Sequence, residues 1–598
     1  MGPCRIDPFG ERANQGVCGA TGDGIAARNL LRNLLGGAAA HSDHGREIVH
    51  ALALAAEGTS HAYKIKGRAK LRRLAAEYGI AVDGRSDQDL AKDLAELLLE
   101  EFGKQKGSLM NVRRAPPQQQ KNWAAANVTP RGVDREVVTG MHMTHIGVDN
   151  EPEHILMASV RAALADGWGG SMMATDVSDV LFGEPRPLRA RVNLGVLKAD
   201  EINLVVHGHE PTLSDVIVAA ARDPDLLAEA RAAGANGINL AGICCTANEI
   251  LMRHGIPVAG NFLQQELAIM TGVVDVMLVD VQCVFPAIAG LQNCFHTKVV
   301  STSPKAQFPG AIHIKFHEEK AMETAREIVR LAIENFSRRD PAKVNTPKAQ
   351  ERLVAGFTTE VVFEILGGRY RPSFRPLNDG ILAGRLRGVA GVVGCNNPKF
   401  PHDAYHLAMV KELIRNGVLV LQTGCSAIAC AKAGLLAPEA AERHAGKGLQ
   451  EICRAVGIPP VLHVGSCVDN SRILTACAEL VKEGGIGESF DKLPVAGAAP
   501  EWMSEKAISI GMYVVASGIF TVLNPPLPIR GSQYVERLLT AAFQEHFGAT
   551  WAFEADPIKA AHLMIDRIDG KRADLGLPPP MYEVPDPPQK AQVLVAAS

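Results

Sequence analysis

Apolar residues recur every three or four positions through much of the first third of the chain. This spacing places them on one side of a helix and therefore predicts amphipathic α-helices. The segments that show it are Ile25–Leu35, Gly45–Ala56, Ala69–Tyr78, Asp87–Phe102 and Pro152–Asp166. Between them, Arg113–Arg135 is polar and rich in glutamine and proline, which predicts a surface loop.

The pattern changes near Val192, where short β-branched runs begin to alternate with helical segments. Near-continuous apolar runs are typical of parallel strands that are covered on both faces. Six such runs are Ile202–Val206, Gly237–Ile243, Val273–Val281, Val389–Val393, Val418–Gln422 and Pro460–Val464. Strand–helix alternation predicts the α/β class. We expect an N-terminal helical domain (1–187) followed by two Rossmann-like doubly wound α/β domains (188–338 and 339–598).

Composition narrows the classes of function. The chain has 598 residues, with 62 lysines and arginines against 65 acids, so neither a nucleic-acid groove nor an anionic membrane surface is expected. The stretch Ala507–Ile529 carries no charge but contains three prolines, and it is predicted to be a helix buried on all sides rather than a transmembrane segment. The first residues lack the apolar core of a secretory signal, so a cytoplasmic location is expected.

Metal-ligating side chains stand at the carboxyl ends of the six predicted strands, where α/β proteins bind ligands. They are His209, Cys245, Cys283, Cys395, Cys425 and Cys467. A single buried cysteine is usually a small hydrophobic residue, but six ligands at the same topological place favour a metal site. Their wide spacing is unlike a structural zinc site and favours an iron–sulfur cluster. The remaining cysteines Cys244, Cys294, Cys430, Cys453 and Cys477 are expected to be structural.

Several longer motifs identify a family. The segments MGPCRIDPFGE, GVCGA, HSDHGR, VHGHEPTLS, GICCTANE, GCNNPK, TGCSAIACAKAG and HVGSCVDNSR closely resemble, in order, those of the nickel-containing anaerobic carbon monoxide dehydrogenases. The related hybrid-cluster proteins share the fold but use carboxylates at some positions where this chain has cysteine.

The resemblance implies a role for each ligand of a nickel–iron–sulfur cluster. His209 and Cys245 correspond to the ligands of a unique iron, and Cys467 corresponds to the nickel ligand. Cys283, Cys395 and Cys425 correspond to the three thiolates of the iron–sulfur portion.

The resemblance also implies residues that act beside the cluster. Lys506 is similar to a lysine that stabilises negative charge on a metal-bound carboxylate, and His41 is similar to a histidine that accepts protons. His44 and His50 continue the row from His41 at three-residue steps, whereas Glu47 stands where a further histidine is expected. Ile510, one helical turn beyond Lys506, is expected to shape an apolar pocket for a small gas.

A second, 4Fe-4S cluster is implied at Cys4 and Cys18. Only two of its four thiolates are present in this chain, because the family places two more just before Met1 and those of a shared cluster further upstream. A truncated N-terminus is therefore expected.

The implied activity is the reversible oxidation of carbon monoxide with water to carbon dioxide, two electrons and two protons. A hybrid-cluster-type reductase of hydroxylamine or nitric oxide, or an inactive homologue without electron-transfer clusters, are the alternatives. The resemblance also implies a homodimer and a ferredoxin-like electron carrier, and it leaves an acetyl-CoA synthase partner open.

Overall fold

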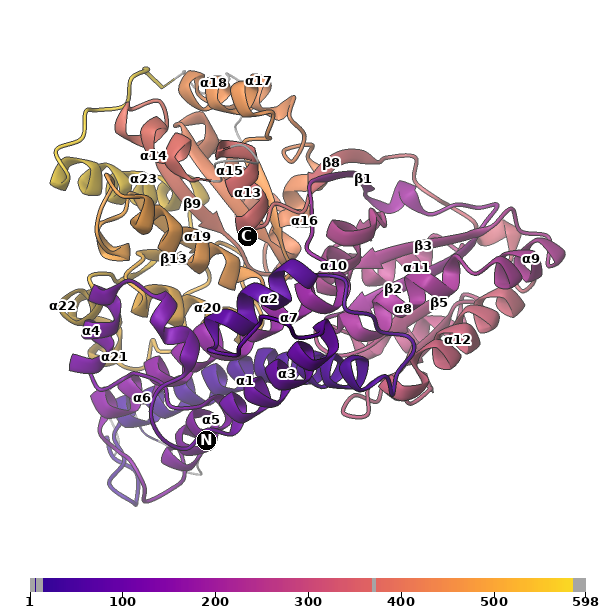
Figure 1. The fold of residues 1–598 in the computed structure, drawn as a ribbon, viewed down its shortest axis with the longest axis horizontal. Helices are drawn as coiled ribbons and strands as arrows, with labels where there is room; N and C mark the ends of the chain where they lie inside the picture. The colour runs from indigo at the N-terminus through magenta and orange to yellow at the C-terminus, as the bar shows by residue number, and fades with distance from the viewer. Residues whose placement is uncertain (1–5, 7–13, 368–372, 585–598) are drawn as a thin grey trace.

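A computed structural model of the chain describes residues 6, 14–367 and 373–584. Figure 1 shows three lobes: helices from the first part of the chain along the lower side, and two α/β lobes on the right and at the upper left. The predicted fold class is confirmed, since a helical region precedes two series of alternating strands and helices. The limits proposed above for the three domains stay predictions.

The helical region is built around one long central helix. Helix α1 begins after Thr21, whose side chain accepts a hydrogen bond from the Gly24 amide (3.2 Å), and ends at Gly58 in the left-handed conformation. The helices of this region are α1 (Gly22–Glu57), α2 (Arg68–Glu77), α3 (Asp87–Gly103), α4 (Pro117–Ala125), α5 (Val133–Met143), α6 (Pro152–Ala165) and α7 (Ser171–Phe182). A π-helical turn, Asp166–Gly170, joins α6 to α7 without a break.

The loop predicted for Arg113–Arg135 is wrong. The segment contains α4, which begins with Pro117 in its first turn, and the start of α5. Trp123 of α4 is fully buried and donates a hydrogen bond to the carbonyl of Ala516 (2.7 Å). Tertiary packing on one tryptophan therefore outweighs the polar composition that favoured a loop.

The two α/β lobes share one hydrogen-bonded sheet in the order β14-β13-β12-β9-β10-β11-β8-β1-β4-β3-β2-β5-β6-β7. Its strands are β1 (Leu188–Val192), β2 (Ile202–Gly208), β3 (Ile238–Ile243), β4 (Val258–Gly260), β5 (Val274–Val279), β6 (Lys298–Ser301), β7 (Ile312–His313), β8 (Glu351–Ala355), β9 (Gly388–Val392), β10 (Val418–Thr423), β11 (Val461–Gly465), β12 (Val495–Ala499), β13 (Thr521–Leu523) and β14 (Trp551–Phe553). All six strands predicted from the sequence are present. Neighbouring strands run parallel except β1 and β8, whose antiparallel pairing joins the two lobes.

Helices cover both faces of this sheet, as in doubly wound folds. Those of the first lobe are α8 (Pro211–Ala221), α9 (Pro224–Ala232), α10 (Cys244–His254), α11 (Gln265–Met270) and α12 (Ala321–Phe336). Those of the second lobe are α13 (Thr359–Gly367), α14 (Arg375–Leu382), α15 (Ala404–Arg415), α16 (Gly424–Lys432), α17 (Ala440–His444), α18 (Lys447–Val456), α19 (Asn470–Glu483), α20 (Glu505–Ala516), α21 (Gln533–Arg537), α22 (Phe543–Phe547) and α23 (Pro557–Asp574).

The single buried helix predicted over Ala507–Ile529 is correct only in its first part. Helix α20 is buried but ends at Ala516, and the chain then turns at Gly518 into strand β13. The run lacks charge because a core helix and a core strand follow one another. No helix in the described part of the chain is long and apolar enough to cross a membrane.

Candidate metal centre

The six ligands predicted at strand ends converge on one buried site between the two α/β lobes. The Sγ atoms of Cys245 and Cys467 lie 3.1 Å apart, although the two residues are 222 positions apart in sequence. The Sγ of Cys283 lies 3.8 Å from Nε2 of His209. Cys395 and Cys425 are buried in the same cluster of side chains. Within each lobe the strands run parallel, so their carboxyl ends share one edge of that lobe's part of the sheet, and the residues at these two edges meet between the lobes.

A seventh side chain, Cys244, also lies inside the site. Its Sγ is 4.0 Å from Nε2 of His209 and 4.0 Å from Sγ of Cys425. The sequence had grouped Cys244 with the structural cysteines, although its place beside Cys245 at a strand end was a usable signal. Among the described residues, two sets of potential ligands have their ligand atoms within 4.8 Å of one another: His209 with Cys244 and Cys283, and His209 with Cys245 and Cys467.

In each α/β lobe, a glycine and an aspartate shape the turn that contains one of the potential ligands. Gly208 and Gly465 precede His209 and Cys467 with φ of 138° and 140°, a conformation that favours glycine. An aspartate packs against each glycine: Asp280 accepts hydrogen bonds from the amides of His209 (2.7 Å) and Glu210 (3.1 Å). In the second lobe, Asp469 accepts from the amide of Ser466 (2.8 Å). A Cβ on Gly208 or Gly465 would lie 1.6 or 2.1 Å from the carboxylate oxygen, so only glycine fits.

Lys506 places a buried cation against these ligands. It is 3% exposed, its Nζ donates a hydrogen bond to Nε2 of His209, and it lies 3.9 Å from Sγ of Cys283. Burial lowers the pKa of the Lys506 amine, but the surrounding cysteine sulfurs outweigh it and the net shift is upward. Lys506 is therefore charged at neutral pH.

The donor set fits a soft metal cluster. Burial raises the pKa of the Cys395 thiol to about 12, so this thiol keeps its proton at neutral pH unless a cation replaces it. Sulfur and imidazole donors favour iron, nickel and other transition metals over magnesium or calcium. Six buried or partly buried cysteines gathered around one histidine favour a metal site, because cysteines that only fill a core as small hydrophobic residues need not converge on one point.

A buried histidine–aspartate pair lies beside the cluster of ligands. His41 of α1 is 1% exposed, and its Nδ1 lies 3.0 Å from Oδ2 of Asp166 in the π-helical turn. Ser171 and Ser509 each donate a hydrogen bond of 2.6 Å to the same carboxylate. The Nε2 of His41 has no hydrogen-bond partner within the described ranges. Sequence reasoning missed Asp166, whose only signal was the glycine-rich segment that follows it.

The histidine row predicted on α1 begins at buried residues and ends at an exposed one. His44 is buried, and burial, followed by the charges of His209, His41 and Lys506, lowers its pKa. His44 lines a cavity of about 650 Å³ together with Lys305. Glu47 forms an ion pair with Lys305, and His50 is exposed. The row thus runs from the buried pair at His41 towards solvent, with a carboxylate at its third step.

The remaining predicted residues are placed as follows. Ile510 is buried on α20, one turn from Lys506. Cys18 is exposed and lies far in sequence from the seven side chains of the site, and Cys4 lies outside the described residues.

The chain is similar over most of its length to known proteins. The model of the Prismane/CO dehydrogenase family matches residues 1–558. The chain is 56% identical over 577 residues to carbon monoxide dehydrogenase 1 of Methanosarcina mazei, which covers 96% of this chain and 91% of that protein. A nickel-free crystal structure of carbon monoxide dehydrogenase from Thermococcus sp. AM4 superposes with a TM-score of 0.94 at 50% identity, covering 97% of this chain and 90% of that one. Carbon monoxide dehydrogenase IV from Carboxydothermus hydrogenoformans gives 0.93 at 45% identity, covering 96% and 92%.

Proposed function

The chain belongs to the Prismane/CO dehydrogenase family, and from this premise we propose that it catalyses the reversible oxidation of carbon monoxide with water to carbon dioxide, two electrons and two protons. The observation that carries the proposal is the convergence of His209 and the cysteines on one buried site beside Lys506.

The proposed ligands are those that the strand ends bring together. His209 and Cys245 hold an iron, Cys467 holds nickel, and Cys283, Cys395 and Cys425 hold the iron–sulfur portion. When bound, this nickel–iron–sulfur cluster supplies the metal centres that activate carbon monoxide and water and accept the two electrons. Cys245 and Cys467, whose Sγ atoms lie 3.1 Å apart, would hold their metals from the first and the second α/β lobe.

Lys506 and His41 handle charge and protons in this proposal. The Lys506 ammonium is fixed in a pocket from which water is excluded, where a cation stabilises developing negative charge more strongly than it does in water. His41 accepts a proton at Nε2, because Nδ1 is held by Asp166, which orients the ring and stabilises the imidazolium. His44 and the cavity beyond it then lead towards solvent.

The donor set argues against a hybrid-cluster-type reductase. Both sets of potential metal ligands among the described residues consist of histidine and cysteine, with no carboxylate. An inactive homologue is not favoured either, because the ligands, Lys506 and His41 all lie together.

Assembly and electron transfer extend the proposal. We propose a homodimer, supported by exposed apolar side chains on and after α5: Val138 (63%), Met141 (49%), Ile146 (62%) and Val148 (44%). Cys4 and Cys18 are proposed to belong to a 4Fe-4S cluster that delivers electrons to a ferredoxin-like carrier. A cytoplasmic location and an acetyl-CoA synthase partner stay predictions.

The test is carbon monoxide-dependent reduction of a viologen dye by the anaerobically purified, nickel-loaded chain. We expect activity in the wild type, and its loss together with loss of nickel in Cys467→Ala. The matched control is Cys453→Ala, which removes another buried thiol, one that lies outside the cluster of ligands. Activity that survives Cys467→Ala, or that falls equally in Cys453→Ala, would contradict the proposed nickel ligand.

A further inference from the structure

We propose that Arg472 is a positioning residue for Cys467, which it clamps to the helical region through Asp179. The inference rests on the proposed function, in which Cys467 is the nickel ligand. The clamp is formed by Arg472, Asp469 and Asp179, none of which belongs to the set of potential ligands. Asp469 and Arg472 lie in the motif HVGSCVDNSR, but the sequence assigned none of the three a role.

The Arg472 guanidinium joins two carboxylates at once. Its Nη1 and Nη2 donate to the two oxygens of Asp179 at 2.8 and 2.9 Å, while its Nε donates to Oδ1 of Asp469 at 2.9 Å. The three side chains are buried, with 4% exposure for Arg472 and less for the carboxylates. A planar fork of donors with bonds on two sides fixes both carboxylates relative to each other.

Asp469 connects Arg472 to the turn that contains Cys467. Its Oδ2 accepts hydrogen bonds from the amide and hydroxyl of Ser466 at 2.8 and 3.2 Å. On the other side, Thr175 of α7 donates to Oδ1 of Asp469 at 2.9 Å and approaches the carbonyl of Val468 at 3.3 Å. Residues on both sides of Cys467 are therefore held, although Cys467 itself touches neither Arg472 nor Asp179.

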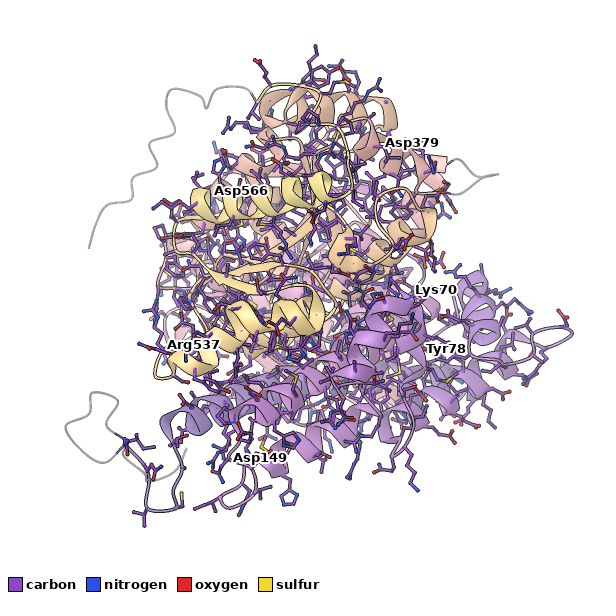
Figure 2. All side chains as sticks on the ribbon, turned by 90° about the vertical axis from the view of Figure 1, so that its left-hand side faces the viewer. Lys70, Tyr78, Asp149, Asp379, Arg537 and Asp566 are labelled. Carbon is purple, nitrogen blue, oxygen red and sulfur yellow. The ribbon has the colours of Figure 1, made fainter. Side chains whose placement is uncertain are left out.

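Asp179 belongs to α7 and is anchored from two further parts of the fold. Lys70 of α2 donates to it at 2.9 Å, and Arg253 of α10 donates at 2.8 Å. Figure 2 shows Lys70 where the helical region meets the second α/β lobe. The three lobes thus meet at one carboxylate, so the position of the Cys467 sulfur depends on how the lobes dock.

Arg253 offers a matched control for Arg472. Both guanidinium groups bind Asp179 and both are buried, but Arg253 makes its other side-chain bonds to Glu249 and to the carbonyl of Gly183. It reaches Asp469 only through Glu249, which bonds to Asp469 and Ser466, whereas Arg472 bonds to Asp469 directly. Substitution by lysine keeps the charge in each case. An ammonium group lacks the planar fork, so Arg472→Lys breaks the link between Asp179 and Asp469, whereas Arg253→Lys leaves it intact.

The first measurement is the nickel affinity of each purified variant, with iron content and thermal unfolding measured on the same samples. A residue that orients a metal ligand from outside typically changes metal affinity about 10- to 100-fold, and we expect a loss of this size in Arg472→Lys. Iron content is expected to hold. Nickel affinity should remain near wild type in Arg253→Lys, even where the unfolding temperature falls. Equal nickel affinity in the two variants would overturn the proposal.

A milder variant covers the case in which Arg472→Lys does not fold. Thr175→Val is close to isosteric and removes the hydroxyl contacts to Asp469 and Val468, together with the hydrogen bond that the hydroxyl accepts from Ser471. Ser159→Ala, which removes a buried hydroxyl that bonds within its own helix, is the control. We expect weaker nickel binding in Thr175→Val alone, and nickel binding equal to that of the control would count against the clamp.

A metal-free readout separates this inference from the proposed function. In the metal-free chain, diamide accepts two electrons and two protons from Cys245 and Cys467 as their disulfide forms, and peptide mass spectrometry follows its rate. The Sγ atoms are 3.1 Å apart, so we expect rapid closure in wild type and Arg253→Lys and slower closure in Arg472→Lys. If the wild type binds no nickel, the proposed metal role is refuted. If the disulfide closes at the same rate in wild type and in Arg472→Lys, the clamp is refuted, whatever the nickel binding.

Discussion

At the residue scale, buried charges at the site are tolerated because each one meets a partner. Lys506 faces cysteine sulfurs and His209, and Asp166 receives two serine hydroxyls besides His41. An unpaired charge in such a place is strongly disfavoured. The pairs therefore fix which atoms remain available for chemistry, and Nε2 of His41 is one of them.

Replacing Asp166 by asparagine tests this arrangement. Asp166→Asn removes the negative charge that stabilises a protonated His41, so kcat for carbon monoxide oxidation should fall by roughly 100-fold or more. Metal content should stay unchanged, since Asp166 contacts none of the ligands directly. The control is Asp149→Asn, which alters an exposed pair with His154 (2.6 Å) and should leave kcat unchanged. Equal kcat in both variants would rule out a role for Asp166 in proton handling.

At the scale of elements, close helix packing sets the distance between the proton acceptor and the cation. Helix α1 carries His41 and His44, and α20 carries Lys506. The two helices approach each other at Gly37, where an added Cβ would lie 2.3 Å from the carbonyl oxygen of Glu505. The absence of a side chain at Gly37 therefore helps to hold His41 and Lys506 on adjacent helices.

Gly37→Ala should push α20 away from α1. Overpacking of a tight interface typically destabilises a protein by about 1–3 kcal/mol, and turnover should fall with it because Lys506 follows Glu505. The neighbouring Gly36→Ala is the control, because its Cβ would meet nothing closer than 4.0 Å and alanine favours a helix. The measurements are the thermal unfolding temperature and the rate of viologen reduction of both variants. A Gly37→Ala protein as stable and active as Gly36→Ala would show that the contact is unimportant.

At the scale of the whole molecule, buried ion pairs hold together segments that lie far apart in the sequence. Asp176 of α7 lies 3.0 Å from Lys70 and 2.7 Å from Arg114. Burial raises the pKa of Asp176, but Arg114 and Lys70 outweigh it and lower the pKa to about 2. Because the unfolded value is 3.8, the unfolded chain binds more protons between these limits, and the stabilisation is complete above about pH 4.

This linkage predicts how an Asp176→Asn variant behaves with pH. The shift corresponds to about 2 kcal/mol of stability at pH 7 that the variant should lack. The difference from wild type should shrink as the pH falls from 4 towards 2, where the wild-type carboxyl also takes up its proton. Denaturant unfolding at a series of pH values measures it. Asp93→Asn, in an exposed pair with Arg85, should show little effect, and a difference in Asp176→Asn that does not depend on pH would contradict the assignment.

Much of the fold and most of the site could be predicted from local sequence. Six strand ends could be predicted because an apolar run is followed there by a metal-ligating residue, in most cases with glycine beside it. Both signals, the apolar run of a buried strand and the glycine that makes room for a bulky group, lie in neighbouring residues. The same reasoning failed at Arg113–Arg135, where a buried tryptophan outweighs polar composition. It also failed in the second part of Ala507–Ile529, where lack of charge does not distinguish a core helix from a core strand.

The sequence by itself determined the α/β class, and it predicted the six strand-end residues proposed as ligands and, through its motifs, Lys506 and His41. Only the tertiary structure decided that β1 and β8 join the lobes into one sheet, that Cys244 lies within the site, and that Asp166 holds His41. It also decided that Arg472 links Asp179 to the turn of Cys467. The physical reason is that periodicity and turn chemistry act between neighbours in the chain. Hydrogen bonds between residues more than a hundred positions apart depend on how complete elements pack against each other.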